Sequence, residues 1–174
     1  MNKRIFASAA LAVLAAVSFA AAQNKTPDFG GKWKLDMSKS ELGERSRIES
    51  MDMTVEQTSD SLSVERTPKF AGGGEGMGAM GRGMMGGGKM TYDLSGKETK
   101  VEGSMGNAML KAENGKDGKL VLTQNRNLET QMGSFSLKTV ETWELSADGK
   151  TLTINSSTET PRGNRTQKMV FGRQ

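Results

Sequence analysis

The chain offers few side chains that could do chemistry, and the most unusual group lies in a glycine-methionine tract at residues 72–90. The tract holds ten of the 22 glycines and five of the 13 methionines. Thioethers are soft ligands that select Cu(I). A hypothesis of Cu(I) binding therefore concerns four methionines of the tract: Met77, Met80, Met84 and Met85. The competing interpretation is a flexible loop at residues 72–88, because glycine is costly to order and has no side chain to pack.

The composition excludes most other catalytic centres. The chain has no histidine and no cysteine. A Ser-His-Asp triad, a Cys-His dyad and a histidine-ligated zinc site are therefore excluded, and so is a disulfide. Only carboxylates, lysines and a single tyrosine, Tyr92, remain for proton transfer. We expect no enzymatic activity and no cofactor.

The elements that must position any site are β-strands. Apolar residues recur at every second position in most segments past residue 30. This pattern is typical of antiparallel strands that have one face exposed to solvent. The predicted strands include 31–37, 51–57, 61–67, 89–94, 135–145, 151–155 and 167–171. Short turn signals separate them: Ser59-Asp60, Ser95-Gly96, Asp117-Gly118 and Asp148-Gly149.

Strands joined by consecutive hairpins, with no helix to cover their apolar face, must close on themselves or fold into a sandwich, and a barrel both buries the face and removes the edges. We predict an all-β fold, an antiparallel up-and-down β-barrel of eight to ten strands, with no sheet edges left. The segment 39–47 lacks the alternation and is expected to be a loop or short helical turn across one mouth of the barrel. Residues 155–165 are expected to be a strand end followed by a loop.

Inward positions of the predicted strands supply candidate ligand contacts. They are Tyr92, Phe135, Glu141 and Trp143. Glu141 shares the parity of Trp143, so it is expected to point inward, where an unpaired carboxylate is costly. The alternative is a bulge near Val140 that turns Glu141 outward.

Two segments carry a family resemblance. "DFGGKWKLDMSKSELG" at residues 28–43 resembles the opening of lipocalin-like secreted bacterial proteins of unknown function, and "ETWELSADGKTLTI" at 141–154 resembles their late hairpin. Gly31 and Trp33 match the Gly-x-Trp signature of lipocalins. The resemblance implies a barrel with Trp33 at its closed end, beside an arginine from near the last strand. Arg165 and Arg173 are both candidates for that arginine.

The N-terminal residues indicate export. Lys3 and Arg4 precede an apolar run that ends in small residues, a pattern typical of a secretory signal peptide at residues 1–22. The expected mature domain spans residues 23–174, in the periplasm or secreted. Loss of Lys3 and Arg4 leaves 22 basic against 20 acidic residues, so we expect no nucleic-acid binding. The predicted outward faces are polar, which excludes insertion into a membrane as a barrel.

Three functions remain open at this level. The first is an exported barrel that binds a small apolar ligand without catalysis. The second is a structural or interaction protein of the cell envelope with a filled barrel. The third is Cu(I) binding through the methionines of the tract. We expect a monomer in each case.

Overall fold

The computed structural model describes residues 26–44, 46–72, 88–103, 106–130, 133–161 and 163–174, and these form ten antiparallel strands. The first four strands are β1 (Gly31–Leu35), β2 (Ile48–Gln57), β3 (Ser61–Phe70) and β4 (Met90–Asp93). The other six are β5 (Thr99–Gly103), β6 (Gly106–Asn114), β7 (Leu120–Thr130), β8 (Gly133–Leu145), β9 (Thr151–Thr160) and β10 (Gly163–Arg173).

All ten strands belong to one sheet in the order β4-β3-β2-β1-β10-β9-β8-β7-β6-β5. The first strand pairs with the last, so the meander returns on itself and the predicted up-and-down barrel is confirmed. The expectation that no edges remain is wrong. The described parts of β4 and β5 stand at the two ends of the sheet and do not pair with each other. These edges are short, at four and five residues, which limits their exposed backbone.

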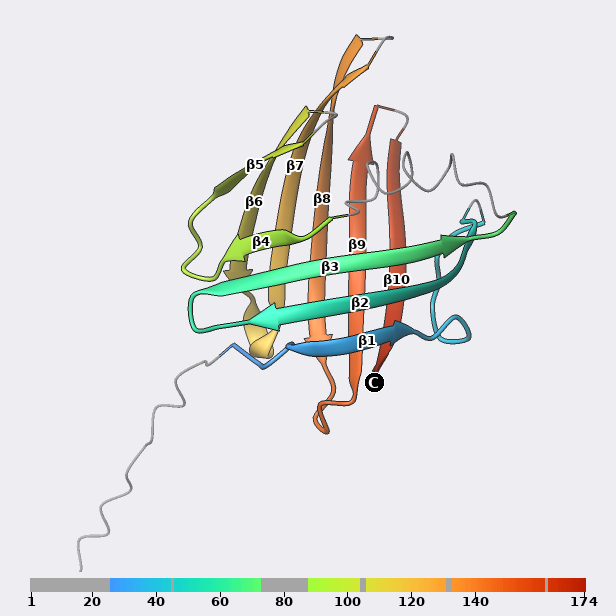
Figure 1. Cartoon of the computed structure of the whole chain (residues 1–174), viewed down its shortest axis with the longest axis vertical. Helices are drawn as coiled ribbons and strands as arrows, with labels where there is room; N and C mark the ends of the chain where they lie inside the picture. The colour runs from blue at the N-terminus through green and yellow to red at the C-terminus, as the bar shows by residue number, and fades with distance from the viewer. Residues whose placement is uncertain (1–25, 45, 73–87, 104–105, 131–132, 162) are drawn as a thin grey trace, which may run out of the picture.

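The sheet folds into two layers that enclose the core. Figure 1 shows β1 to β4 crossing in front of β6 to β10, with β5 rising away from β4 at one side. Side chains from both layers form one apolar cluster. Its largest fully buried side chains are Phe29, Trp33, Met53, Leu62, Leu110, Leu120, Leu122, Trp143, Leu152, Ile154 and Phe171.

Turn chemistry follows the predicted signals. Between β6 and β7 the chain makes a short 3₁₀ turn, η1 (Lys116–Gly118), in which Asp117 and Gly118 both adopt a left-handed backbone with φ of 59° and 72°. Aspartate and glycine tolerate this conformation better than other residues. Gly149 likewise has a positive φ of 68° in the turn between β8 and β9.

One loop prediction is wrong. Residues 155–165 belong mostly to strands, since β9 runs to Thr160 and β10 starts at Gly163. The described residues of segment 39–47 form the expected loop between β1 and β2, and they contact β10. Glu41 forms a β-bridge with Lys168, and the Ser40 hydroxyl accepts a hydrogen bond from the Val170 amide at 2.9 Å.

The predicted signal peptide and residues 73–87 of the glycine-methionine tract lie outside the described residues. The four methionines of the Cu(I) hypothesis are among them: Met77, Met80, Met84 and Met85.

Candidate functional site

One end of the barrel is sealed around Trp33. The Trp33 indole Nε1 donates a hydrogen bond to the Phe29 carbonyl at 3.0 Å, and the Phe29 ring meets the Trp143 ring edge-on, with centroids 5.7 Å apart. All three aromatic side chains are fully buried. This is the closed end that the Gly-x-Trp resemblance implies for Trp33.

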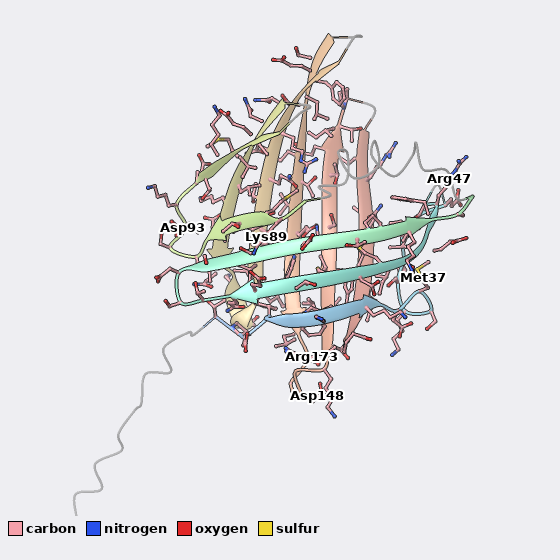
Figure 2. The ribbon with its side chains drawn as sticks, viewed as in Figure 1. Met37, Arg47, Lys89, Asp93, Asp148 and Arg173 are labelled. Carbon is pink, nitrogen blue, oxygen red and sulfur yellow. The ribbon has the colours of Figure 1, made fainter. Side chains whose placement is uncertain are left out.

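Arg173 covers the closed end from outside. Its guanidinium lies 4.4 Å from the Trp33 ring centroid and donates to three backbone carbonyls, those of Asp28, Gly30 and Gly149. Figure 2 shows Arg173 at this end, near the loop that carries Asp148. Of the two arginines considered from the sequence, Arg173 is therefore the one beside Trp33.

Gly31 makes room for that arginine. Its φ is +132°, a conformation that side chains rarely adopt, and a Cβ at this position would lie 3.0 Å from an Arg173 nitrogen. The glycine of the Gly-x-Trp signature thus lets the arginine reach the indole.

On the inner face of β7 to β10, side chains lie in rows that run across the strands. Because the strand registers are continuous, inward residues that are Cα partners form straight rows. Two rows near the closed end, here called the apolar rows, contain Leu35, Phe171, Leu152 and Leu145, followed by Met169, Ile154, Trp143 and Leu120.

The next two rows, here called the polar rows, consist mostly of polar side chains. The first contains Leu122, Glu141, Ser156 and Gln167, and the second contains Gln124, Thr139, Thr158 and Arg165. Burial changes in parallel. Leu152 and Ile154 are 0% exposed, whereas Ser156 and Thr158, further along the same strand, are partly exposed. Leu122 and Glu141 of the first polar row are still buried, so solvent reaches the inner face at Ser156, at Gln167 and along the second polar row. This open half is the candidate site.

The strand pairing around Glu141 shows to which side of the sheet its side chain points. Leu122 and Ser156 are its Cα partners, and the pairing of β8 with β7 and β9 continues without a register shift there. The alternative of a bulge near Val140 is therefore wrong, and Glu141 points inward.

A salt bridge between the two layers forms the floor of the open half. Arg66 of β3 donates from Nη2 to Glu141 Oε2 at 2.7 Å, and the Trp143 indole Nε1 donates to the same oxygen at 2.9 Å. The side chains of Arg66 and Glu141 are only 17% and 10% exposed. The guanidinium carbon also lies 5.8 Å from the Trp143 ring centroid. The carboxylate that was costly alone is thus paired and hydrogen-bonded.

Arg66 is held as a cation but retains an unused donor. Burial alone would lower its pKa, but the adjacent Glu141 carboxylate raises the pKa above its usual value. Its buried Nε–H has no hydrogen-bond acceptor among the described residues. Buried donors without a partner are rare in native proteins. This atom marks the floor as a place where an acceptor from another molecule would be accommodated.

Tyr92 of β4 lies beside this floor. Burial raises the pKa of its hydroxyl well above 10.0, and the Glu141 charge raises it further. The tyrosine is therefore neutral across the physiological range and cannot act as a base there. It contributes an apolar ring with a polar tip to the wall.

Gln124 and Arg126 lie further toward the open end on β7. In the amide orientation that satisfies both groups, the Gln124 oxygen accepts from Arg126 Nε and Nη2, the latter at 2.9 Å. The Met90 sulfur of β4 lies 3.4 Å from the same amide group. Burial lowers the pKa of Arg126, although a guanidinium remains charged at neutral pH. On β8 and β9, the Thr139 and Thr158 hydroxyl oxygens are 3.1 Å apart.

Of the four residues predicted to contact a ligand, three lie close together in the structure and one does not. Glu141, Trp143 and Tyr92 come together at the floor. Phe135 does not join them. It is partly buried near the tip of the β7–β8 hairpin, opposite Leu128.

The arginines and the hydroxyl-bearing residues of the site are not among the residues predicted from the sequence. A signal for them existed, because Arg66 continues the two-residue period of Leu62 and Val64 along β3. In the same way, Gln124 and Arg126 continue the period of Leu120 and Leu122 along β7.

The described ranges hold no group of three or more histidine, cysteine, aspartate or glutamate side chains placed to bind a metal ion. No helix among the described residues has the length and apolarity needed to span a bilayer.

Comparison with known proteins supports the fold class. No protein-family model matches the chain, and no curated protein matches it in sequence. Among solved structures, the zebrafish ileal bile acid-binding protein in complex with cholic acid is similar. The TM-score is 0.51 at 14% identity, over 84% of this chain and 98% of that chain. The fold is therefore that of a lipocalin-like β-barrel.

Proposed function

We propose that the chain is an exported binding protein that holds a small, largely apolar molecule in the open half of the barrel and catalyses no reaction. The observation that carries this proposal is that inner side chains are fully buried in the apolar rows and partly exposed further along the same strands. The apolar rows already supply a packed core, so the solvent-reached rows beyond them are not needed as core.

Partly exposed inner positions favour binding over a filled interior. A barrel filled by its own side chains would bury Ser156, Thr158 and Gln167 as fully as Leu152 and Ile154. These three polar residues are partly exposed instead. The structural relative supports the same direction, since it was solved with cholic acid, a small molecule with a large apolar body. Ligand sites are commonly apolar with a few placed polar groups.

The test is a titration with Nile red, a neutral dye that fluoresces in apolar surroundings. We expect saturable binding to the wild-type chain. Thr158→Trp places a large side chain on the inner face of the open half and should abolish binding. Asn155→Trp is the matched control, because Asn155 is exposed on the outer face of the same strand.

The outcomes separate the candidate functions. Binding that is lost in Thr158→Trp and kept in Asn155→Trp supports the proposal. Absence of binding, or equal loss in both variants, contradicts it and favours the filled barrel. Native mass spectrometry of the protein from its own host would add the identity of a retained molecule, and the mass of the mature chain would test cleavage after residue 22.

A further inference from the structure

The floor of the open half holds a buried hydrogen-bond donor that no described residue satisfies. Arg66 uses Nη2 to donate to Glu141 Oε2 at 2.7 Å. The Nε–H of the same guanidinium is buried and has no acceptor among the described residues. A buried donor without an acceptor costs free energy. An acceptor brought to Nε by another molecule would therefore be bound favourably.

The contacts of Arg66 hold this donor in one orientation. The guanidinium is planar, so its bond to Glu141 and its position 5.8 Å from the Trp143 ring centroid fix the direction of the Nε–H bond. Burial opposes the charge of Arg66, but the Glu141 carboxylate raises the pKa of the guanidinium above its usual value. The donor is therefore a fixed, cationic N–H, and such donors form strong hydrogen bonds.

An anionic acceptor would be disfavoured at this donor. A second carboxylate on Arg66 Nε would stand close to Glu141, and like charges in a poorly solvated place repel strongly. The pKa of the Tyr92 hydroxyl reflects the same negative charge, since it is raised by burial and then further by Glu141. A neutral oxygen avoids this repulsion. A carbonyl oxygen also brings no donor of its own that would need a partner.

Apolar side chains lie outward of the floor along the inner face of β8. Leu137 and Phe135 share the inward parity of Glu141, and both are partly buried. Leu128 of β7, the Cα partner of Phe135, is 4% exposed. The strand from Glu141 to Phe135 spans about 20 Å, since each residue of a strand adds about 3.3 Å. Apolar contacts are therefore available at about the reach of a long hydrocarbon chain from the floor.

We propose that the molecule held in the open half is neutral and is bound with its oxygen innermost: a carbonyl oxygen at one end accepts from Arg66 Nε–H, and the apolar body extends toward Leu137 and Phe135. This inference rests on the proposed function, because it specifies the class and orientation of that molecule. Arg66 then determines ligand specificity in addition to pairing with Glu141.

The contact is tested by observing the Arg66 Nε–H resonance in proton–nitrogen correlation spectra of the wild-type chain. Decyl methyl ketone should move the proton resonance downfield, because a hydrogen bond to Nε–H forms. Its methylene analogue, in which CH₂ replaces the carbonyl oxygen, should leave the resonance in place. Arg173 is the internal control, because its Nε already donates to the Gly149 carbonyl at 2.8 Å at the closed end.

The contribution of this contact to affinity is measured by competition against Nile red. We expect the ketone to compete about tenfold better than its methylene analogue, as one hydrogen bond to a charged donor provides. The double variant Arg66→Met/Glu141→Leu should lose this preference, because its floor is apolar. Lys100→Met/Glu102→Leu is the matched control, since it removes an exposed salt bridge and should keep the preference.

Failure of the inference is distinguishable from failure of the proposed function. If the ketone and its analogue displace Nile red equally and leave Arg66 Nε–H unmoved, the inference is wrong and ligand binding stands. A free-protein resonance already as far downfield as that of Arg173, and unmoved by the ketone, also overturns the inference. If dodecanoate moves the resonance further than the ketone does, the neutral class is wrong. If neither Nile red nor the ketone binds, the proposed function itself is wrong. The wild-type data stand independently if the double variant at Arg66 and Glu141 does not fold.

Discussion

Arg66 and Glu141 lie 75 residues apart in sequence and form a 2.7 Å salt bridge that joins β3 to β8 across the interior of the barrel. This bridge separates the packed half from the half that solvent reaches. The two side chains therefore define where the core ends and the candidate site begins.

Removing one partner of this bridge should destabilise the protein strongly. Glu141→Leu leaves the Arg66 charge buried without its carboxylate and removes the acceptor of the Trp143 indole. We expect the free energy of unfolding to fall by about 3 kcal/mol. In the double variant Arg66→Met/Glu141→Leu, no unpaired charge remains, and most of the loss should be recovered. Urea denaturation at neutral pH measures both.

The matched control is a salt bridge on the outer surface. Lys100 and Glu102 form one at 2.9 Å, but their side chains are 54% and 79% exposed. Glu102→Leu should leave stability nearly unchanged, because exposed pairs contribute little. Similar losses for Glu141→Leu and Glu102→Leu would show that the interior bridge is not buried as described.

Arg173→Ala should loosen the closed end. The substitution removes hydrogen bonds to the carbonyls of Asp28, Gly30 and Gly149 and the stacking on Trp33. We expect a loss of about 2 kcal/mol, seen as a lower thermal midpoint. Arg173→Lys should rescue little of it, since an ammonium cannot reproduce the planar guanidinium fork. Arg165→Ala, at the other end of β10, should be nearly neutral for stability.

Gly31→Ala should destabilise the same end by a different route. The φ of +132° is strained for alanine, and the new methyl group would press on the Arg173 guanidinium. A loss above about 1 kcal/mol is expected in thermal unfolding. Gly172→Ala is the control, because a Cβ there meets no atom within 4 Å and its φ is not in the left-handed region. Equal effects of the two substitutions would contradict the account of the Gly-x-Trp segment.

Tyr92 provides a test of burial through alkaline titration. It is the single tyrosine, so the tyrosinate absorbance reports on it alone. Its pKa is raised in the folded protein above the ordinary value of 10.0. The stabilisation linked to this group is therefore complete below pH 10.0, and it is lost as pH rises above that value, because the unfolded state releases the proton first.

We expect no tyrosinate signal at pH 10.0 while the protein stays folded, and ionisation only together with alkaline unfolding. In Tyr92→Phe, stability should fall less steeply with pH above 10.0. Ionisation of the folded protein with an ordinary pKa would contradict the placement of Tyr92 beside Glu141.

Much of the fold follows from the alternation of apolar residues. Leu152, Ile154 and Phe171 lie on the inward faces that the two-residue period predicts, because the period is unbroken where the interior is apolar. The hairpin turn at Asp117-Gly118 was predictable because aspartate and glycine tolerate a left-handed backbone.

The open half was harder to predict because its interior is polar. Ser156 and Thr158 point inward, but they are polar like the outward residues beside them. The alternation therefore predicts a strand that ends at residue 155, whereas β9 runs to Thr160. Arg66 and Arg126 are likewise polar residues at inward positions, which the alternation of apolar residues does not reveal. Their roles depend on partners from other strands, and no local pattern states that β3 will face β8.

The most direct test of the binding account is an amide NMR titration of the wild-type chain with decyl methyl ketone. The account predicts that chemical-shift changes gather at Thr139, Ser156, Thr158 and Arg126, while Leu152 and Phe171 in the apolar rows stay nearly unchanged. Saturation without these changes, or changes confined to the outer face around Asn155 and Lys138, would contradict a ligand held in the open half of the barrel.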